Sequence, residues 1–430
     1  AYGDPQLPSP STVEDKMLVP LIAAIALLLA APTALAGDRV LVVEDGQVHE
    51  RWDPYLPPDP EPLEPDPLPP SAQSAAQGEI KQAVERAAAK GSIGEHQHRR
   101  FTRILNDAHR LYDRRSVGRR CRSQVGRVLG IMSAIAARGS LNASRMPALF
   151  LQLERNVEFW EQEPDIRLGE RVSFGKDPLL LQHYAGYGLQ IQPLGNFGKA
   201  NGLWTECKER PGDCKRNMLH ALLESMLRVA SRRGGFKAWE YWFPFGGGFP
   251  PWASGMATAT GMQALSRGAV FFGEPRFMKA AKNALPIFFK PAPLGVRLES
   301  GRGAHYLLYS FAPGLRVLNA FLQAITGLYD YAKLSDDHRA DRLFHAGDKR
   351  ARRETPRYDT GSWSYYALPN KNLSTWDYHV LVTGFLENLC ERTGARVYCR
   401  TARRFARYTR EHGGPPPPGT PGSGRRCGYL

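Results

Sequence analysis

Apolar residues recur at steps of three and four positions along most of this 430-residue chain. Such a period puts them on one face of an α-helix, and that face must pack against another element. The pattern therefore predicts helices on both sides of one differently built segment, residues 167–192. The predicted helices are Gln77–Ala89, His98–Arg114, Cys121–Ala137, Pro147–Glu161, Asn217–Arg232, Ser254–Phe272, Pro275–Phe288, Gly314–Ala332, Trp376–Glu391 and Ala395–His412. Many antiparallel helices joined by moderate loops favour a helical toroid or solenoid over a sheet protein.

The segment Arg167–Gln192 is rich in β-branched and aromatic residues and contains the turn-forming run Gly175–Pro178. A turn between two such runs predicts a β-hairpin. A short strand is also predicted at Val40–Val43. The predicted fold class is therefore mainly α, with a small β insert.

The apolar run from Met17 to Ala36 ends in Ala-Leu-Ala before Gly37. This small-residue ending marks the cleavage site of a secretory signal peptide, so residues 1–36 are expected to be a leader and signal. An uncleaved membrane anchor is the weaker alternative, because Pro20 and Pro32 interrupt a run that is barely long enough to span a bilayer. In either case the folded part is expected to be secreted or to lie in the cell envelope.

Two other segments have the composition of unpacked chain. Asp53–Pro70 alternates acids with prolines, which predicts a stiff, extended linker. The Pro- and Gly-rich residues from Gly413 onward predict a disordered tail. The rest of the chain then divides into a Pro-rich linker, an N-terminal helical region, a main domain and the tail, at residues 37–73, 74–164, 165–412 and 413–430.

Two pairs among the six cysteines enclose short loops, Cys207 with Cys214 and Cys390 with Cys399. Local pairs of this kind favour disulfides, each stabilising the fold by about 2–3 kcal/mol through loop entropy. Zinc is excluded because no His stands at finger-like spacing and the pairs lack the Cys-x-x-Cys form. Cys121 and Cys427 have no obvious partner.

The chain carries an excess of positive charge, +15, which favours a polyanionic partner or reflects a bias in composition. Nucleic acid is the default polyanion for a basic chain. A secreted protein more often meets acidic polysaccharide or anionic lipid, so nucleic acid is not the expected partner. With 42% hydrophobic and 10% aromatic residues, the chain can bury one large core or two smaller ones.

Short motifs near the C-terminal end carry most of the functional information. They are Tyr358-Asp-Thr-Gly-Ser362 and Trp376-Asp-Tyr-His379, with Tyr366 between them. Upstream, the run Leu307–Asn319 leads into Gly327-Leu-Tyr-Asp-Tyr331. In order and in most of their spacing, these segments resemble the C-terminal region of the glucuronyl 5-epimerases, which invert carbon 5 of glucuronic acid in heparosan and heparan chains.

The resemblance extends from about Leu181 to Arg410 and implies an (α/α) toroid whose concave end holds the sugar chain. It also implies that Tyr309, Tyr366 and Tyr378 are the catalytic residues. The predicted domain at 165–412 is then an epimerase-like catalytic toroid. The helices at 74–164 do not match the animal enzymes and rest on their apolar pattern alone.

Inverting carbon 5 of a uronate requires removing a proton next to a carboxylate and returning one on the opposite face. The site needs a base, an acid and groups that stabilise the enediolate. Tyrosine can serve on both faces, but as a base its pKa of about 10 must be lowered by neighbouring cations. The alternative, for a chain with 17 tyrosines, is that each is hydrogen-bonded and inert in the core.

Further residues are expected to contact the polysaccharide: Tyr187, Gln190, Tyr358, Lys371 and His379. Tyr187 is preferred, because with Gln190 it lies on the segment that faces the cleft in the family. His379 either contacts the uronate or packs in the core. Lys371 either supplies a cation or is a solvated loop lysine.

Two other short runs are assigned local structural roles. Asp359, Thr360 and Ser362 are expected to close the turn of the first motif through side-chain hydrogen bonds. The run Gly246–Gly248 lacks the Lys and Ser/Thr of a phosphate loop, so it is expected to form a flexible lip over the cleft.

Leu307 and Leu308 stand where the family has an acidic pair, which leaves other functions open. A polysaccharide lyase begins with the same proton abstraction and then expels the carbon-4 group. A non-catalytic glycan-binding protein is the second alternative. A glycoside hydrolase needs two opposed carboxylates, and no clear pair exists among Glu299, Asp359 and Asp377. The expected partner is an acidic uronate-containing polysaccharide, a homodimer is left open, and no cofactor or metal is expected.

Overall fold

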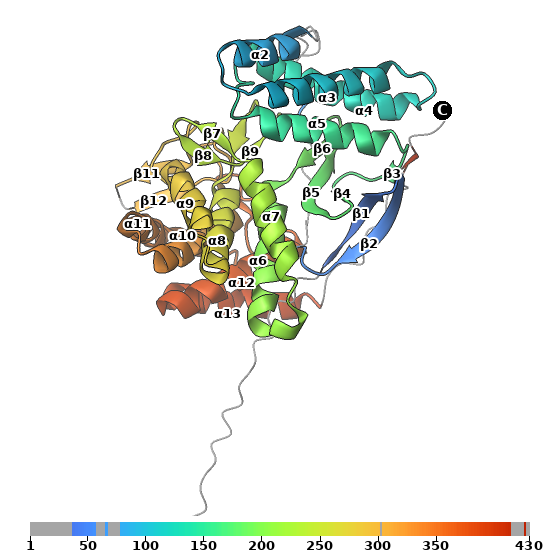
Figure 1. The fold of residues 1–430 in the computed structure, drawn as a ribbon. Helices are drawn as coiled ribbons and strands as arrows, with labels where there is room; N and C mark the ends of the chain where they lie inside the picture. The colour runs from blue at the N-terminus through green and yellow to red at the C-terminus, as the bar shows by residue number, and fades with distance from the viewer. Residues whose placement is uncertain (1–36, 57–64, 68–77, 302, 414–424, 427–430) are drawn as a thin grey trace, which may run out of the picture. The chain divides into compact units, whose positions relative to one another are not determined.

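The computed structural model describes residues 37–56, 65–67, 78–301, 303–413 and 425–426. The predicted signal peptide and most of the predicted tail lie outside these residues. The described residues fall within one compact unit that is built mainly of helices, as predicted (Figure 1). Among the residues that the structure describes, no helix is both long and apolar enough to cross a membrane.

One five-stranded sheet has the order β2-β1-β4-β5-β6. Its strands are β1 Asp38–Glu44, β2 Gln47–Asp53, β4 Arg171–Phe174, β5 Asp177–Tyr184 and β6 Gly188–Ile191. The hairpin predicted at residues 167–192 is confirmed by β4 and β5, which pair antiparallel around a turn at Gly175 and Lys176. The short β3 Asp165–Ile166 pairs instead with β15 Arg425–Arg426.

The strand predicted at Val40–Val43 lies inside β1, but its partner β2 was not predicted. Asp45 and Gly46 both have positive φ, 51° and 71°, as a two-residue hairpin turn requires and as Asp-Gly favours. The strand β1 also runs parallel to β4, and its valines are buried. Residues 38–53 therefore belong to the sheet, although the composition placed them in a linker.

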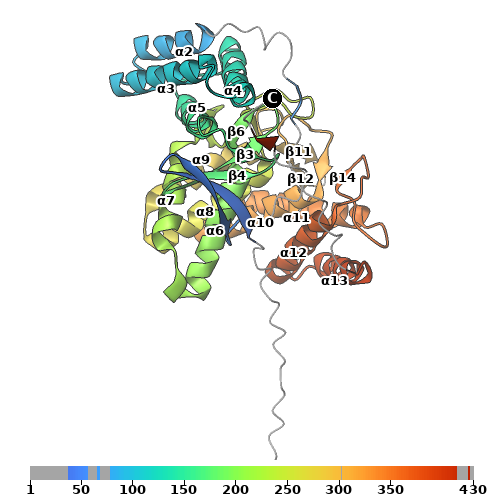
Figure 2. The same cartoon turned by 90° about the vertical axis from the view of Figure 1, so that its right-hand side faces the viewer.

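The N-terminal helices are α2 Gly78–Ala89, α3 Glu95–Asp113, α4 Arg119–Ala137 and α5 Met146–Trp160, close to their predicted bounds. Figures 1 and 2 show α5 between the α3–α4 layer and the sheet. The buried side chain of Asn156 on α5 accepts a hydrogen bond from the Leu189 backbone N–H on β6 at 2.8 Å and donates one to the Leu189 carbonyl at 2.8 Å. The helical region is thus bonded directly to the sheet.

The rest of the chain forms consecutive helix pairs: α6 Pro193–Glu209 with α7 Arg216–Arg228, α8 Gly255–Phe272 with α9 Pro275–Ala284, α10 Leu318–Ser335 with α11 His338–Glu354, and α12 Trp376–Thr393 with α13 Arg396–Glu411. Short 3-10 helices follow three of them, at residues 211–213, 285–288 and 355–358. The helix α8 also packs against α6 and α10, and α10 packs against α12. This paired arrangement agrees with the predicted (α/α) toroid-like fold (Figure 2).

Two of these helices, α6 and α11, were not predicted. The helix α6 contains Gly195, Gly198 and Gly202, which lower helix propensity. The helix α11 does bury residues at three- and four-residue steps, but they include Gly347 and Asp348 and so do not read as apolar. Burial against neighbouring helices, rather than composition, fixes both elements.

Turns inside the pairs are short, whereas connections between pairs are long and carry the remaining strands. These strands are β7 Ser231–Arg233, β8 Phe236–Ala238, β9 Glu240–Tyr241, β10 Trp252–Ala253, β11 Arg297–Ser300, β12 Gly303–Tyr306, β13 Arg316–Val317 and β14 Ala367–Leu368. A short turn between packed helices makes them antiparallel, so each pair starts and finishes at one end. We call that end, with its long connections, the connection end, and the opposite end the turn end.

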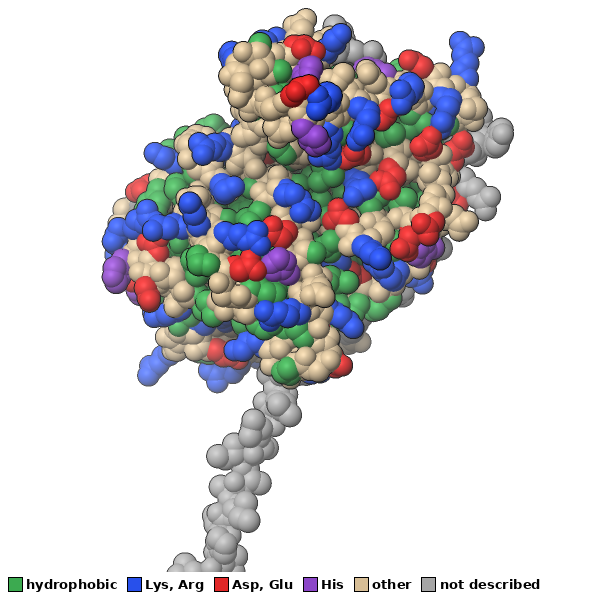
Figure 3. Space-filling model, in the orientation of Figure 1, with side chains coloured by type: hydrophobic (Ala, Val, Ile, Leu, Met, Phe, Trp, Pro, Cys, Tyr) green, Lys and Arg blue, Asp and Glu red, His purple; other side chains and the backbone are tan. Residues whose placement is uncertain are grey.

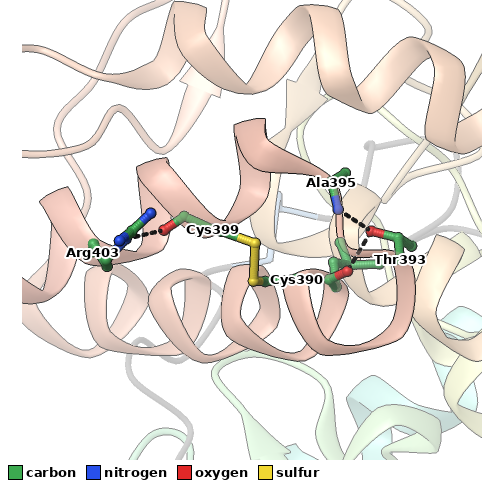
Figure 4. The surroundings of a disulfide bond; sticks show 6 residues. Cys390, Thr393, Ala395, Cys399 and Arg403 are labelled. Carbon is green, nitrogen blue, oxygen red and sulfur yellow. Dashed lines mark hydrogen bonds between the residues drawn. A yellow bond between two sulfur atoms is a disulfide. The ribbon is translucent and has the colours of Figure 1, made fainter.

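Disulfides close two of the turns at the turn end, as predicted. Cys207 and Cys214 join the end of α6 to the start of α7, with an S–S distance of 1.93 Å. Cys390 and Cys399 join α12 to α13 at 2.00 Å (Figure 4). Cys121, for which no partner was predicted, is also disulfide-bonded, and its partner lies outside the described residues. Disulfides are consistent with a protein outside the cytoplasm.

Candidate active site

Four tyrosines meet at the connection end. Tyr241 lies on β9 between α7 and α8, and Tyr309 lies between α9 and α10. Tyr366 lies between α11 and α12, and Tyr378 is in the first turn of α12. Each of the three connections between pairs therefore supplies a phenol, and the fold brings together residues that are far apart in the sequence.

Tyr309 is the most buried of the three tyrosines predicted to be catalytic, with 6% of its surface exposed. Its phenol is hydrogen-bonded to Tyr366. The ring centroids of Tyr366 and Tyr378 lie 4.8 Å apart, and both of these residues are half-buried. The site thus consists of one buried phenol beside two that solvent reaches.

Aromatic rings hold Tyr309 in place. Phe311 stacks on it at 5.4 Å between centroids, and the rings of Phe245 and Trp252 lie at 5.1 and 5.6 Å. Tyr241 stacks in turn on Trp252 at 4.2 Å with nearly parallel planes. Trp252 therefore separates two of the phenols and fixes the orientation of both rings.

Backbone hydrogen bonds anchor the tyrosines to their connections. Ser310, next to Tyr309, donates its N–H to the Ala253 carbonyl at 2.9 Å. The carbonyl of Tyr366 accepts from Leu318 N at the start of α10, and its N–H donates to the Asn372 carbonyl at 2.7 Å. These bonds tie the three connections to one another.

Burial raises the pKa of Tyr309 well above its ordinary value, and the nearby phenols of Tyr366, Tyr378 and Tyr241 raise it further. The sequence analysis expected neighbouring cations to lower the pKa of a tyrosine base. At Tyr309 the surroundings act in the opposite direction. The neutral phenol is favoured there, so Tyr309 is suited to donate a proton rather than to remove one.

Leu308, in place of the family's acid, lies in an apolar cluster beside Tyr366. The cluster contains buried Met256, Val317 and Ala320, with Leu308 and Tyr366 packed against it. Leu307 is fully buried, and its carbonyl accepts from the Gly255 N–H at 3.1 Å. The position before Tyr309 thus contributes packing where a carboxylate would contribute charge.

Tyr187, the preferred binding residue, is buried and points its hydroxyl at another part of the chain. The hydroxyl donates to the backbone carbonyl of Asp66 at 2.6 Å. Burial is the main cause that raises the pKa of Tyr187, Asp66 adds to it, and Arg127 opposes it. A segment from the acidic Pro-rich run therefore occupies the polar group that was expected to meet the substrate.

All contacts that the structure describes for the Gln190 side chain are with other residues of the protein core. It is fully buried, donates to the Tyr187 carbonyl at 2.6 Å and accepts from Gln152 on α5 at 2.9 Å. It therefore supports Tyr187 from below, on the side of the sheet that α5 covers.

His379 and Tyr358 are also buried beside the site. The ring of His379 stacks on Trp363 at 3.6 Å, and its two nitrogens are hydrogen-bonded to Ser364 and to the Phe405 carbonyl. Burial lowers the pKa of His379, so the neutral ring is favoured. Of its two expected roles, these contacts favour packing.

Tyr358 donates its hydroxyl to the Arg316 carbonyl at 2.9 Å, and burial raises its pKa. Asp359 accepts from Gly361 N at 2.9 Å and the Thr360 hydroxyl accepts from Trp363 N at 2.8 Å, so the predicted turn closure is present. Lys371 is exposed in the tight loop that follows Tyr366, with a φ of 55°.

The sequence analysis missed Tyr241 and the buried acid next to it, Glu240. The carboxylate of Glu240 takes bidentate bonds from Arg145 at 2.8 and 3.0 Å and one from Arg233 at 2.8 Å. Arg145 precedes α5, so this network fastens the N-terminal helices to the connection that holds Tyr241. The run from Trp239 to Phe245 is densely aromatic, which was the available signal for a structured platform.

One group in the described part of the chain has the spacing of metal ligands: His220, Glu224 and Glu274. Arg276 already lies 2.7 Å from Glu224 and 2.5 Å from Glu274, and its hydrogen bonds to Glu274 lower the pKa of that carboxyl. The arginine takes the place of a cation, so the donor set does not fit a metal well. On the face drawn in Figure 3, Lys and Arg are interspersed with Asp and Glu over the molecule, rather than gathered in one patch.

The paired helices define a protein with an (α/α) toroid-like fold, and the phenols cluster at one end of it. Residues 234–407, which contain the whole cluster, match the family described as D-glucuronyl C5-epimerase C-terminus. Through this segment the chain is similar to the D-glucuronyl C5-epimerases.

The chain is similar to the D-glucuronyl C5-epimerase of Caenorhabditis elegans, with 32% identity over 178 residues. The match covers 37% of this chain and 29% of that protein. Among solved structures, a D-mannose isomerase has a TM-score of 0.36 at 13% identity, over 50% of this chain and 59% of that one. The endo-beta-1,4-glucanase CMCax from Acetobacter xylinum has a TM-score of 0.35 at 13% identity, over 49% and 67%.

Proposed function

We propose that this protein inverts carbon 5 of glucuronic acid residues in an acidic, heparosan-like polysaccharide. The observation that carries the proposal is the meeting of Tyr309, Tyr366 and Tyr378 at the connection end. The match of residues 234–407 to the D-glucuronyl C5-epimerase C-terminus supports the same reaction. The domain at 165–412 is then the catalytic unit.

In this proposal the burial of each of the three phenols determines its role in proton transfer. Tyr309, kept neutral by its apolar surroundings, donates the proton to one face of carbon 5. Tyr366 and Tyr378 are half-buried, and their closeness suits one to remove the original proton while the other donates a hydrogen bond to the sugar carboxylate. Gln190, Tyr358 and His379 support the site through their internal hydrogen bonds, and Tyr187 remains a candidate to contact the polymer.

Deuterium uptake at carbon 5 tests this function. The protein is incubated with heparosan and with other uronate polymers in deuterated water, and the products are followed by proton NMR. Replacing Tyr309, Tyr366 or Tyr378 by Phe should slow uptake by about 10²–10⁴-fold, the usual contribution of a positioned acid or base. Tyr329→Phe is the control, because this half-buried phenol on α10 contacts Phe344 instead.

The other functions give different results in the same experiment. An ultraviolet-absorbing unsaturated product would indicate a lyase. If the wild-type protein binds the polymer without deuterium uptake, it is a glycan-binding module. The apolar Leu308, in place of the family's acid, is compatible with that function. Full uptake in all three Phe variants would end the epimerase proposal.

We also propose that the chain is exported by the signal at Met17–Ala36 and works outside the cytoplasm. The two disulfides at the turn end support an oxidising compartment. N-terminal sequencing of the exported protein should then start at Gly37, and an exported protein that retains Met17–Ala36 would contradict cleavage.

A further inference from the structure

Asp66 is tied into the connection end by three hydrogen bonds. Its N–H donates to the Pro244 carbonyl at 3.0 Å, and its carboxylate accepts from the Gly247 N–H at 2.7 Å. Its own carbonyl accepts from the Tyr187 hydroxyl at 2.6 Å. The short segment Pro65–Pro67 thus lies along the run that was expected to form a lip over the cleft.

The backbone of the lip, Phe245–Gly248, leaves one N–H without a partner inside its own turn. Phe245 and Gly248 exchange both of their backbone hydrogen bonds, at 3.0 and 2.8 Å, around Gly246 and Gly247. The two central glycines have φ values of 52° and 79°, which only glycine adopts freely. The hairpin turn leaves the Gly247 N–H without a partner inside the turn, and Asp66 takes it.

The lip is also in contact with the tyrosine cluster. A Cβ added at Gly248 would lie 2.3 Å from the ring of Phe311, so this glycine sits directly on that ring. Phe311 stacks on Tyr309, and Phe245 of the lip lies 5.1 Å from the same tyrosine. Asp66 is therefore separated from Tyr309 by the lip and one aromatic layer.

We propose that the Gly247 N–H and the Tyr187 hydroxyl form a subsite for a uronate carboxylate and a neighbouring sugar oxygen, and that Pro65–Pro67 is its internal occupant. This subsite deepens the proposed function and rests on it. The segment offers the same chemistry as an acidic sugar: a carboxylate for a backbone donor and a neutral oxygen for a hydroxyl.

In the sequence, Asp66 follows three other acids that stand next to prolines, Asp59, Glu61 and Glu64. Asp66 itself occupies both donors of the subsite, so it competes with a polyanionic polymer for them. The polymer must displace Asp66 before it can fill the subsite. The apparent affinity is then lowered by the fraction of molecules in which the subsite is occupied.

Kinetics on heparosan test the occupant role. Asp66→Ala should lower KM by about three- to tenfold with little change in kcat, because no carboxylate then has to leave the Gly247 N–H. Asp66→Asn should have a smaller effect, since its amide oxygen still accepts from Gly247. Glu79→Ala removes the same charge from a half-buried site on α2 and should leave KM unchanged. A higher KM or a lower kcat in Asp66→Ala would mean that Asp66 only supports the lip, and would overturn the proposal.

Hydrogen–deuterium exchange gives an answer that does not depend on catalysis. Saturating heparosan should speed exchange of the Asp66 amide and slow exchange of the Gly247 amide. If this occurs without deuterium uptake at carbon 5, the subsite stands and the epimerase function fails. Heparosan that binds while the Asp66 amide stays protected would overturn the subsite, as would the absence of heparosan binding by both the wild-type and Asp66→Ala proteins.

Discussion

The two ends of the helix pairs are built in different ways. At the turn end, consecutive helices are joined by a few residues, and disulfides close the α6–α7 and α12–α13 turns. At the connection end, long segments cross between pairs, and they are held by aromatic packing and by hydrogen bonds to buried charges. Covalent bonds therefore secure the end that carries no proposed chemistry.

The connection end depends on polar contacts that are individually breakable. Glu240 is fully buried between Arg145 and Arg233, directly before Tyr241. The network joins the N-terminal helices, the β9–β10 pair and the loop at Pro293 and Leu294. For the proposed polymer site such contacts are an advantage, because they position the phenols without closing the end covalently.

The largest effect is expected for the buried carboxylate of this network. Glu240→Ala should lower the free energy of unfolding by about 3–5 kcal/mol, since it leaves two arginines buried without their partner. It should also slow deuterium uptake, because Tyr241 and Trp252 lose their anchor. Urea unfolding and uptake are measured together.

Glu50→Ala is the matched control for Glu240, because it removes an exposed partner of Arg39 and should cost less than about 1 kcal/mol. Equal stability losses in Glu240→Ala and Glu50→Ala would show that the network does not hold the connection end.

A smaller effect that is confined to stability is expected at the turn end. Replacing Cys390 and Cys399 together by Ser should cost about 2–3 kcal/mol by loop entropy. The uptake rate per folded molecule should stay at the wild-type value, since α12 and α13 still pack along their length. A drop in rate beyond the unfolded fraction would mean that the turn end positions Tyr378, and the contrast between the ends would fail.

Alkali is expected to lower the stability of the protein through its buried tyrosines, Tyr309 among them. The folded protein holds the Tyr309 proton more tightly than the unfolded chain, whose tyrosine pKa is 10.0. The stability contributed by the neutral phenol is therefore fully present below pH 10 and is lost as the pH rises above it. Each such proton steepens the fall in unfolding free energy by at most about 1.4 kcal/mol per pH unit.

Tyr309→Phe should therefore make the alkaline fall in stability shallower and also slow uptake by about 10²–10⁴-fold. Tyr398→Phe on α13, whose pKa is likewise raised by burial, should make the fall shallower and leave uptake intact. Stability curves between about pH 9 and 11 compare the two variants. An unchanged slope in Tyr309→Phe would contradict the buried, neutral phenol.

Local patterns were sufficient to predict most helices, the β4–β5 hairpin and the two described disulfides. The motifs around Tyr358 and Trp376 led to the tyrosine cluster, because each tyrosine sits in a short stretch of recognisable sequence. The helix α11 was not predicted, because its buried positions include glycine and aspartate, which are buried only through tertiary contacts. Long-range contacts of this kind leave no local period.

The details of the site show the same limit. Alternation along β6 could not tell that Gln190 faces α5, and nothing near His379 predicted the ring of Trp363 on it. Asp66 looked like part of a linker by composition, although its partners are more than a hundred residues away. Such pairings depend on how the connections fold over one another.

The smallest effect is expected at the exposed edge of the connection end. Lys371 lies in the loop after Tyr366, and its side chain is exposed to solvent. Lys371→Ala should raise KM for heparosan by less than about twofold at moderate salt, because exposed charges are screened beyond about 10 Å. The effect should vanish at high salt, and Lys333→Ala, on the exposed part of α10, is the control. A tenfold rise in KM that persists at high salt would place Lys371 on the substrate and extend the site from the buried phenols to this loop.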